Sequence, residues 1–214
     1  MSYNNSKGGC VMRFDTINTA NASGRLDQLV AHRSPLVRCD AASYMAEHVD
    51  DENHILLLQL LSDRNVLVRV EAADSLSEYP CRKTFDALAA VLNAEKYYLL
   101  KGFAALSLGR VGVEVDAVSA QRLLTEALEG EKRIFVKLCC YESLYLLGCA
   151  NMLERIISLY GSSSYRNRCA VIESLGELLD RSNSERIREF LLSELPNETA
   201  LSVKDKMTDL LKQT

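Results

Sequence analysis

The sequence predicts an all-α fold, an α-α superhelix in which about six helical hairpins stack into a solenoid. Three observations predict it. Apolar residues recur at three- and four-residue intervals along most of the chain, as on one face of a helix. The 214 residues include only 3 Pro and 10 Gly, too few for the tight turns of a sandwich or barrel. Similar ten-residue segments return every 31–36 residues, a length that fits two helices with their turns.

The repeated segment is clearest around a cation that follows an apolar pair. This cation falls at Arg38, Arg69, Lys101, Lys137, Arg168 and Lys204. A small or slim apolar residue follows three positions later, at Ala41, Ala72, Ala104, Cys140, Val171 and Met207. A larger apolar residue stands four positions beyond that, at Met45, Leu76, Leu108, Leu144, Leu175 and Leu211. We expect the small residue to allow close approach of helices and the larger one to fill the core.

Further amphipathic stretches lie between these copies, and each is expected to form the other helix of a hairpin. They are Asp51 to Leu61, Thr84 to Leu92, Asp116 to Leu128, Met152 to Tyr160 and Glu185 to Leu192, with the shorter Gly24 to Val30 as the opening helix. Ser34 and Pro35 indicate a helix start, with Ser as the N-cap and Pro at the first helical position. The sequence therefore predicts twelve helices in six hairpins.

The second copy resembles the second helix of HEAT repeats in its order of residues. Asp63 is followed by Val68-Arg69, by Ala72-Ala73 and by Leu76. The resemblance covers roughly residues 24 to 213 and implies a solenoid of the armadillo type. The fifth copy departs from the pattern at Asn167, and the sixth has Met207-Thr208 in place of the Ala pair. A changed final repeat is expected because a capping helix must face solvent.

The chain divides into two parts by composition. Residues 1–22 are expected to be a mobile leader, because this stretch is largely polar, contains Gly8-Gly9 and lacks the apolar core of a signal peptide. Residues 23–214 are expected to form the HEAT-like repeat domain. No run of eighteen apolar residues occurs, so no membrane contact is expected.

Charge and cysteine content limit the kind of partner and the cellular compartment that we expect. The net charge of −4 argues against a protein that grips the phosphate backbone, so no nucleic-acid partner is expected, while a basic protein partner is compatible with it. The seven Cys are odd in number and include the adjacent Cys139-Cys140, unlike a disulfide framework. A reducing cytoplasm is the simplest setting. No CxxC spacing occurs, and no metal site or cofactor is expected.

The regular row of Arg and Lys has two interpretations. It could be a phosphate-binding row that faces solvent. The HEAT resemblance implies instead that each cation pairs with acids or carbonyls of its own or the adjacent repeat, and we favour this structural role. The recurring Ser75, Ser107, Ser143 and Ser174 are likewise expected to pack or to bond back to their helix rather than act as nucleophiles.

Partner binding is expected where the second helices line the concave side of the array, as they do in HEAT proteins. Positions turned away from the core there carry an acidic stripe with an apolar centre. The predicted partner-binding residues are Glu47, Asp74, Glu78, Phe103, Leu106, Glu142, Glu173, Glu177 and Asp209. Such a surface suits a basic protein, with charge steering approach and apolar contact anchoring it; a solvated helix face is the plainer alternative. Tyr97, Tyr98, Tyr141 and Tyr145 form a second cluster, assigned mainly to packing.

Nothing in the sequence marks a catalytic site, and no catalytic residue is predicted. His32, His48 and His54 have no partner at metal-ligand spacing, and Glu47-His48 reverses the His-Glu pairs of HEAT-type iron hydroxylases. Gly8-Gly9 is not followed by the Lys-Ser/Thr of a phosphate loop, and no GxSxG occurs. HEAT-like alkylpurine DNA glycosylases use a basic concave face with Trp, and this chain has no Trp.

The leading hypothesis is a non-enzymatic adaptor or inhibitor that holds a protein partner on its concave face. Two alternatives stay open. Phycobilin lyases also resemble HEAT arrays, and a bilin-lyase-like role in handling a small molecule predicts a pocket near Cys139 to Tyr145. An immunity protein that neutralises a basic toxin is the other alternative, an analogy without a motif behind it. The oligomeric state is not predicted.

Overall fold

The computed structural model describes residues 26–214, so the predicted leader, residues 1–22, lies outside the described residues. Within residues 26–214 the chain forms twelve α-helices, two short 3-10 helices and no strand, which confirms the predicted all-α superhelix. The elements are α1 (Leu26–Val30), α2 (Pro35–Glu47), α3 (Asp51–Leu60), α4 (Val66–Ser75), η2 (Leu76–Glu78), α5 (Arg82–Ala94), α6 (Tyr98–Val115), α7 (Ala117–Leu128), α8 (Ile134–Leu146), α9 (Met152–Ser158), η3 (Leu159–Gly161), α10 (Tyr165–Glu177), α11 (Ser184–Glu194) and α12 (Leu201–Leu211). None of these helices is long and apolar enough to cross a membrane.

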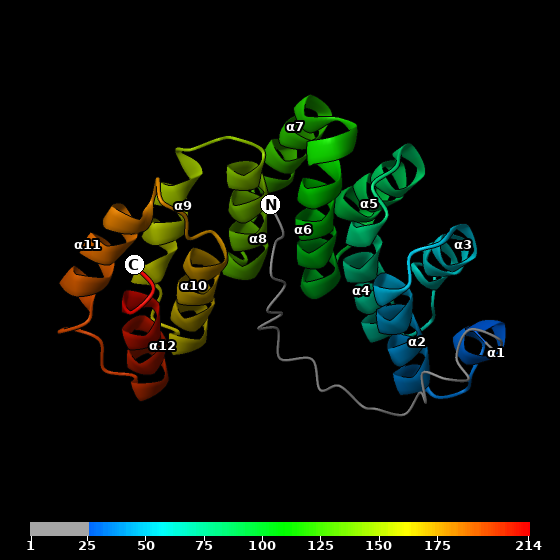
Figure 1. Cartoon of the computed structure of the whole chain (residues 1–214), viewed down its shortest axis with the longest axis horizontal. Coiled ribbons are helices and arrows are strands. Elements are labelled where there is room, and N and C mark those ends of the chain that lie inside the picture. The colour runs from blue at the N-terminus through cyan, green and yellow to red at the C-terminus, as the bar shows by residue number, and fades with distance from the viewer. Residues whose placement is uncertain (1–25) are drawn as a thin grey trace.

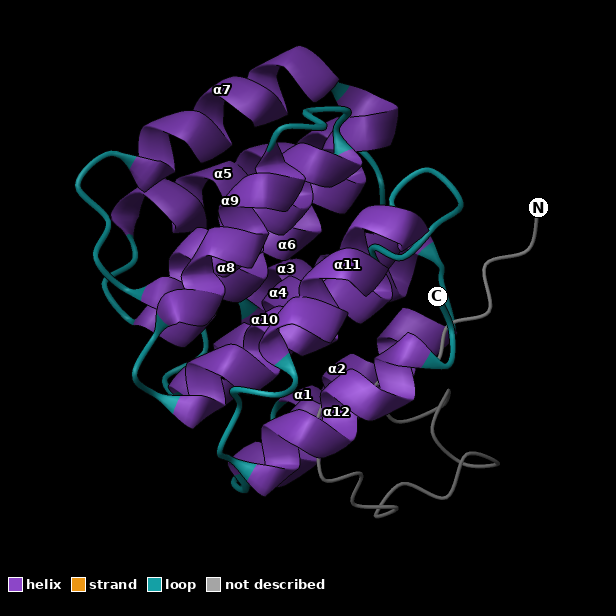
Figure 2. Cartoon of the chain, turned by 90° about the vertical axis from the view of Figure 1, so that its left-hand side faces the viewer, coloured by secondary structure: helices purple, strands orange, loops and turns teal. Residues whose placement is uncertain are grey.

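The helices form two curved layers (Figure 1). The odd-numbered helices lie along the outer side of the arc, and the even-numbered helices line its inner side. Figure 2 shows the same stack from the α12 end. The even-numbered helices are the second helices of the six hairpins, so the expectation that these helices line the concave side is confirmed.

Small residues on the inner helices sit at the centre of the packing. The six predicted small or slim residues, Ala41, Ala72, Ala104, Cys140, Val171 and Met207, are all 0% exposed. The larger residue four positions later is also buried in the first five copies. In the sixth copy the buried side chain is Leu210, and the predicted Leu211 is only half-buried. Within residues 26–214, α12 packs against α10 and α11, and Leu210 is the side chain of its last turn that enters the core.

Helix α2 begins at the predicted residue, but the predicted capping hydrogen bond is not made. Helix α2 begins at Pro35 after Ser34, as expected, yet the Ser34 side chain makes no capping hydrogen bond. In later repeats an acid placed before the inner helix accepts backbone N–H groups instead. Glu95 Oε1 accepts from the amides of Lys96 and Tyr97, each at 2.8 Å. These acids join the helix start to the preceding repeat through the ion pairs described below.

Glycines on α6 set the closest approach between inner helices. A Cβ atom at Gly102 would lie 2.4 Å from the ring of Phe135 on α8, and one at Gly109 would lie 2.5 Å from Cβ of Ser143. No side chain fits at either distance, so both positions require glycine at this spacing. The Ser143 hydroxyl then donates to the carbonyl of Ala105, 2.9 Å away.

The buried apolar side chains fall into two clusters. The first runs from Leu26 to Leu147, and the second runs from Leu138 to Leu210. The boundary between them runs through α8, whose Val136, Cys140 and Leu144 belong to the first cluster and whose Leu138 belongs to the second, together with α10.

Candidate functional site

The inner helices place the N-terminal carboxylates of the predicted stripe near the ends of α2 and α4. Glu47 is the last residue of α2 and is exposed, and Glu78 is the last residue of η2, which continues α4. Asp74 is half-buried on α4 itself. Because a helix C-terminus carries partial negative charge, a carboxylate there is locally unfavourable. Helix stability therefore does not account for Glu47 and Glu78.

The centre of the inner face is apolar, as predicted, and wider than predicted. Phe103 and Leu106 on α6 are half-buried, and their spacing continues to Val113 on the same helical face. Val113 is 53% exposed and Leu146 on α8 is 47% exposed. The sequence argument missed both as contact residues, although the three- and four-residue spacing from Phe103 would have led to Val113.

Glu142 on α8 lies against α10. The Ser174 hydroxyl donates to its carboxylate at 2.9 Å. Burial of the carboxyl raises the pKa of Glu142 to about 7, with Glu177 adding to the effect, while the Ser174 hydrogen bond and the charge of Arg110 partly offset it. Glu142 is thus a packing and hydrogen-bonding group as well as a predicted partner contact.

The C-terminal acids of the stripe are partly neutralised. Glu173 pairs with Lys206 at 2.6 Å, and Asp209 pairs with Lys212 at 2.7 Å. Glu177, the last residue of α10, is exposed and forms no ion pair within residues 26–214. The nine predicted residues therefore form a line along six helices and do not converge on one point.

The predicted structural role of the Arg and Lys row is confirmed in four repeats. Arg38 forms two hydrogen bonds to the carboxylate of Asp63, at 2.7 and 2.8 Å, and Arg168 does the same with Glu198 at the same distances. Arg69 pairs with Glu95 at 3.5 Å and Lys101 pairs with Glu131 at 3.1 Å. Among residues 26–214, Lys137 and Lys204 form no ion pair.

A rule visible in the sequence could have identified the acid partners. Asp63, Glu95, Glu131 and Glu198 each stand six positions before a cation of the row, directly ahead of an inner helix. Each binds the cation of the preceding repeat. Ser162 occupies this position ahead of Arg168, so no acid is available to Lys137.

A second row of cations crosses the loops that precede the inner helices, and all of its members are exposed. They are Arg33, Arg64, Lys96, Lys132 and Arg133, and none forms an ion pair within the part of the chain that the structure describes. Neighbouring loops touch, since Arg133 donates to the carbonyl of Lys96 at 2.9 Å. Cations at helix N-termini oppose the helix dipole. The inner face therefore has a cationic edge at one end of its helices and carboxylates at the other.

Residues 22–109 match the family model described as HEAT repeats. This part of the chain therefore carries HEAT repeats. A similar solved structure is the complex of CpcE and CpcF of phycocyanin lyase from Nostoc sp. PCC7120, with 14% sequence identity and a TM-score of 0.50. The similarity covers 96% of this chain and 99% of that chain, and at this identity it concerns the fold alone. No curated protein matches the sequence.

The region predicted to hold a small-molecule pocket is part of the packed HEAT array. Cys139 and Cys140 are buried, and burial raises the pKa of both thiols, that of Cys140 to about 12. Tyr141 and Tyr145 pack against the second core cluster, and the Tyr145 hydroxyl accepts a hydrogen bond from Asn183 at 2.9 Å. These side chains are engaged in packing, as assigned from the sequence. Tyr97 and Tyr98 lie apart from them, at the start of α6.

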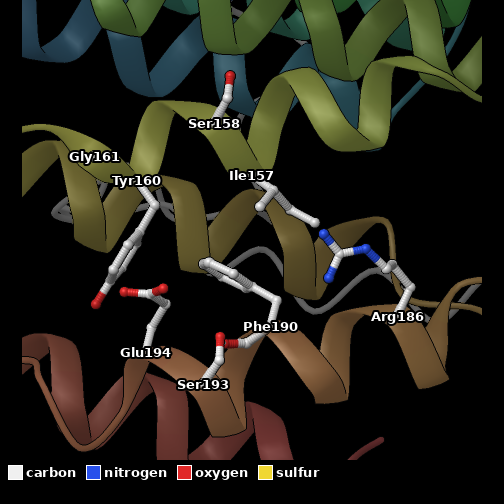
Figure 3. A pocket seen from close by; sticks show the side chains of 8 residues that line it. All are labelled: Ile157, Ser158, Tyr160, Gly161, Arg186, Phe190, Ser193 and Glu194. Carbon is white, nitrogen blue, oxygen red and sulfur yellow. The ribbon is translucent and has the colours of Figure 1, made fainter.

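A hollow of about 380 Å³ lies between the α9–η3 segment and α11 (Figure 3). Its polar lining is largely engaged within the protein. Arg186 pairs with Glu154 at 2.7 Å, and the Tyr160 hydroxyl donates to Glu198 at 2.6 Å. The Ser158 and Ser193 hydroxyls donate to carbonyls of their own helices. The hollow thus offers few unused donors to a ligand.

One cluster was missed by the sequence argument, which considered His54 as a possible metal ligand. His54 on α3 lies 3.8 Å from the sulfur of Cys81, and both contact the hydroxyl of Thr84. His54 and Cys81 are 27 residues apart, and only the packing of one hairpin on the next brings them together. Among residues 26–214 no group of three or more His, Cys, Asp or Glu side chains is placed to hold a metal ion.

Proposed function

We propose that this HEAT-repeat protein is a non-enzymatic scaffold, an adaptor or inhibitor that holds a protein partner on its concave face. One observation carries the proposal: the charges at the ends of the inner helices oppose the helix dipole. Cations such as Arg64 and Lys96 lie at N-termini, and Glu47, Glu78 and Glu177 lie at C-termini. Charges in this arrangement can steer and orient a partner.

The apolar centre supplies the anchorage. Val113 and Leu146 are half exposed between the carboxylates of α2–α4 and those of α10. Large apolar side chains surrounded by charges are typical of a protein-binding surface. The similar solved structure is a complex of two proteins, CpcE and CpcF. The partner we propose has a basic surface facing the carboxylates.

Free thiols, two of them fully enclosed, fit a reducing compartment such as the cytoplasm. Neutralising a basic toxin would be one form of the inhibitor role. A bilin-lyase-like role stands as the alternative from another class; it requires saturable binding of a linear tetrapyrrole, which an absorbance titration of the purified protein measures.

The test reverses the charges that oppose the helix dipole. The triple variant Glu47→Lys, Glu78→Lys and Glu177→Lys places cations at helix C-termini, which favours the helices, so lost binding is not explained by unfolding. The matched control is Glu129→Lys, Glu185→Lys and Glu189→Lys, exposed residues outside the inner helices with the same change in net charge. Each protein is immobilised and exposed to a lysate of the encoding organism.

A partner retained by wild type and by the control, and lost from the inner-face variant, would support the proposal. Isothermal titration with that purified partner would then give the affinity and its salt dependence, which should weaken as ionic strength rises. Equal retention by all three proteins would contradict the role of the concave face.

A further inference from the structure

Three side chains from two hairpins meet at the start of α5. Cys81 is the N-cap residue of this 13-residue helix, and its sulfur lies 3.5 Å from the hydroxyl oxygen of Thr84 in the first turn. The Thr84 oxygen lies 2.8 Å from Nε2 of His54 on α3. The Cys81 sulfur is 3.8 Å from the same nitrogen. Thiol, hydroxyl and imidazole are therefore arranged as a short relay.

The imidazole is held in place by its own contacts. The His54 ring stacks on Tyr79, with centroids 5.2 Å apart and planes 11° from parallel. Tyr79 is fixed in turn, because its hydroxyl donates to the carbonyl of Met45 at 2.5 Å. Burial, and to a lesser extent the charge of Lys83, lower the pKa of His54, so the ring is mainly neutral near pH 7. In the tautomer protonated on Nδ1, Nε2 accepts the Thr84 proton.

The thiol stands in surroundings that favour its deprotonated form. Burial by itself would raise the pKa of Cys81, but the Thr84 hydroxyl 3.5 Å away, the nearby amides of the first turn and the charge of Lys83 lower it. Cys39 shows the opposite case. It is also half-buried, yet burial and the carboxylates of Glu71 and Asp40 raise its pKa to about 11. The chain thus contains an internal reference thiol.

We propose that Cys81 is a reactive thiol and a site of covalent modification, at which a low-molecular-weight disulfide forms a mixed disulfide with the protein. His54 and Thr84 are its positioning residues. The Cys81 proton passes to Thr84 Oγ1 as the Thr84 proton passes to His54 Nε2. The thiolate then attacks one sulfur of the disulfide, whose S–S bond breaks as the new S–S bond forms. The departing thiolate takes up the proton from His54 or from water.

The first experiment measures the rates of modification of individual cysteines. The protein is treated with oxidised glutathione, or with an aromatic disulfide as a faster probe, and the adducts are located by peptide mass spectrometry. Cys81 should react at least about tenfold faster than Cys39 at pH 7, because the rate follows the thiolate fraction and access. Equal rates, or faster reaction at Cys39, would overturn the proposal.

The second experiment tests the relay. Thr84→Val and His54→Gln should slow the reaction at Cys81 severalfold and move the midpoint of its pH–rate profile upward, while the rate at Cys39 stays unchanged. Thr84 is fully buried, so Thr84→Ser serves as the conservative variant that keeps the hydroxyl and should restore the wild-type profile. An unchanged midpoint in both His54→Gln and Thr84→Val would show that the cluster does not activate the thiol. Circular dichroism of each variant confirms that the helices are intact.

Discussion

Two neighbouring contacts between inner helices, here called seams, are built differently. At the α6–α8 seam, Gly102 and Gly109 admit side chains of α8, the Ser143 hydroxyl bonds to Ala105, and Lys101 pairs with Glu131 at 3.1 Å. At the α8–α10 seam, Ser162 stands where the other repeats have an acid, and Lys137 forms no ion pair in the described chain. The boundary between the two core clusters runs through α8, the helix that both seams share.

The difference shows how a repeat array acquires a weak point. Each repeat contacts only its neighbours, so stability is close to a sum of repeat and seam terms. A seam that lacks the ion pair of the other repeats adds less to that sum. We expect the array to open first between α8 and α10, which would change the curvature of the concave face without unfolding either half.

The largest expected change in the free energy of unfolding distinguishes the α10–α12 seam, which has an ion pair, from the α8–α10 seam, which has none at Lys137 among the described residues. Arg168→Ala leaves the Glu198 carboxylate buried without its cation, a change that typically costs about 3–5 kcal/mol. Lys137→Ala, at the same repeat position, should cost less than about 1 kcal/mol because no ion pair is lost. Hydrogen exchange of α12 and α10, with urea unfolding, measures both. Similar losses for the two variants would remove the distinction between the seams.

The next largest change in stability is expected when two glycines at equivalent repeat positions are replaced by Ala. Gly109 and Gly176 occupy the same repeat position on α6 and α10. Gly109→Ala would force a Cβ to 2.5 Å from Ser143 Cβ and should cost about 1–3 kcal/mol. Gly176→Ala meets only Leu210 at 3.6 Å, so the better helix propensity of Ala should leave stability unchanged or raise it by about 0.5 kcal/mol. Thermal unfolding should show a lowered midpoint for Gly109→Ala and an unchanged or raised midpoint for Gly176→Ala, and a loss of the same size in both would contradict the close approach of α6 and α8.

The smallest effect concerns the pH dependence of the α8–α10 seam. The pKa of Glu142 is raised to about 7 in the folded protein, above the value of about 4.5 in the unfolded chain. Its contribution to stability is therefore fully present below about pH 4.5 and is lost as the pH rises through 7. The pKa difference corresponds to about 3 kcal/mol in full, but Glu142 is only partly buried and solvent screens its charge. Glu142→Gln, which keeps an acceptor for Ser174, should therefore be more stable than wild type by about 1–2 kcal/mol at pH 8 and nearly equal to it at pH 4.5. Unfolding free energies of the two proteins across this range measure the difference, and a constant difference would contradict it.

Much of the fold could be predicted because it is encoded locally. The interval between cations, the small residue after each cation and the Pro35 helix start fixed the number of hairpins and which helices form the inner layer. The structural role of Arg38 and Arg168 was also predictable, because it follows from a fixed spacing to an acid in the next repeat. The buried residue of the last helix was predicted one position too late, since Leu210 rather than Leu211 enters the core.

The candidate site was predictable only as a set of positions. The sequence named Phe103 and Glu78 from helical spacing, but that spacing says nothing of what a side chain meets in a neighbouring helix. Enclosure of Glu142 against Ser174, and neutralisation of Glu173 by Lys206, depend on contacts between repeats. Whether the concave face binds a protein rests on the charge-reversal experiment.

The sequence by itself determined that this protein is a stack of helical hairpins with an inner and an outer layer. It could do so because helix periodicity and the small residue are local features, and each repeat contains them again. Tertiary structure decided contacts between repeats that follow no such spacing: Glu142 against Ser174, and His54 brought to Cys81 across 27 residues. Those contacts depend on the rise and rotation between hairpins, which no single repeat encodes.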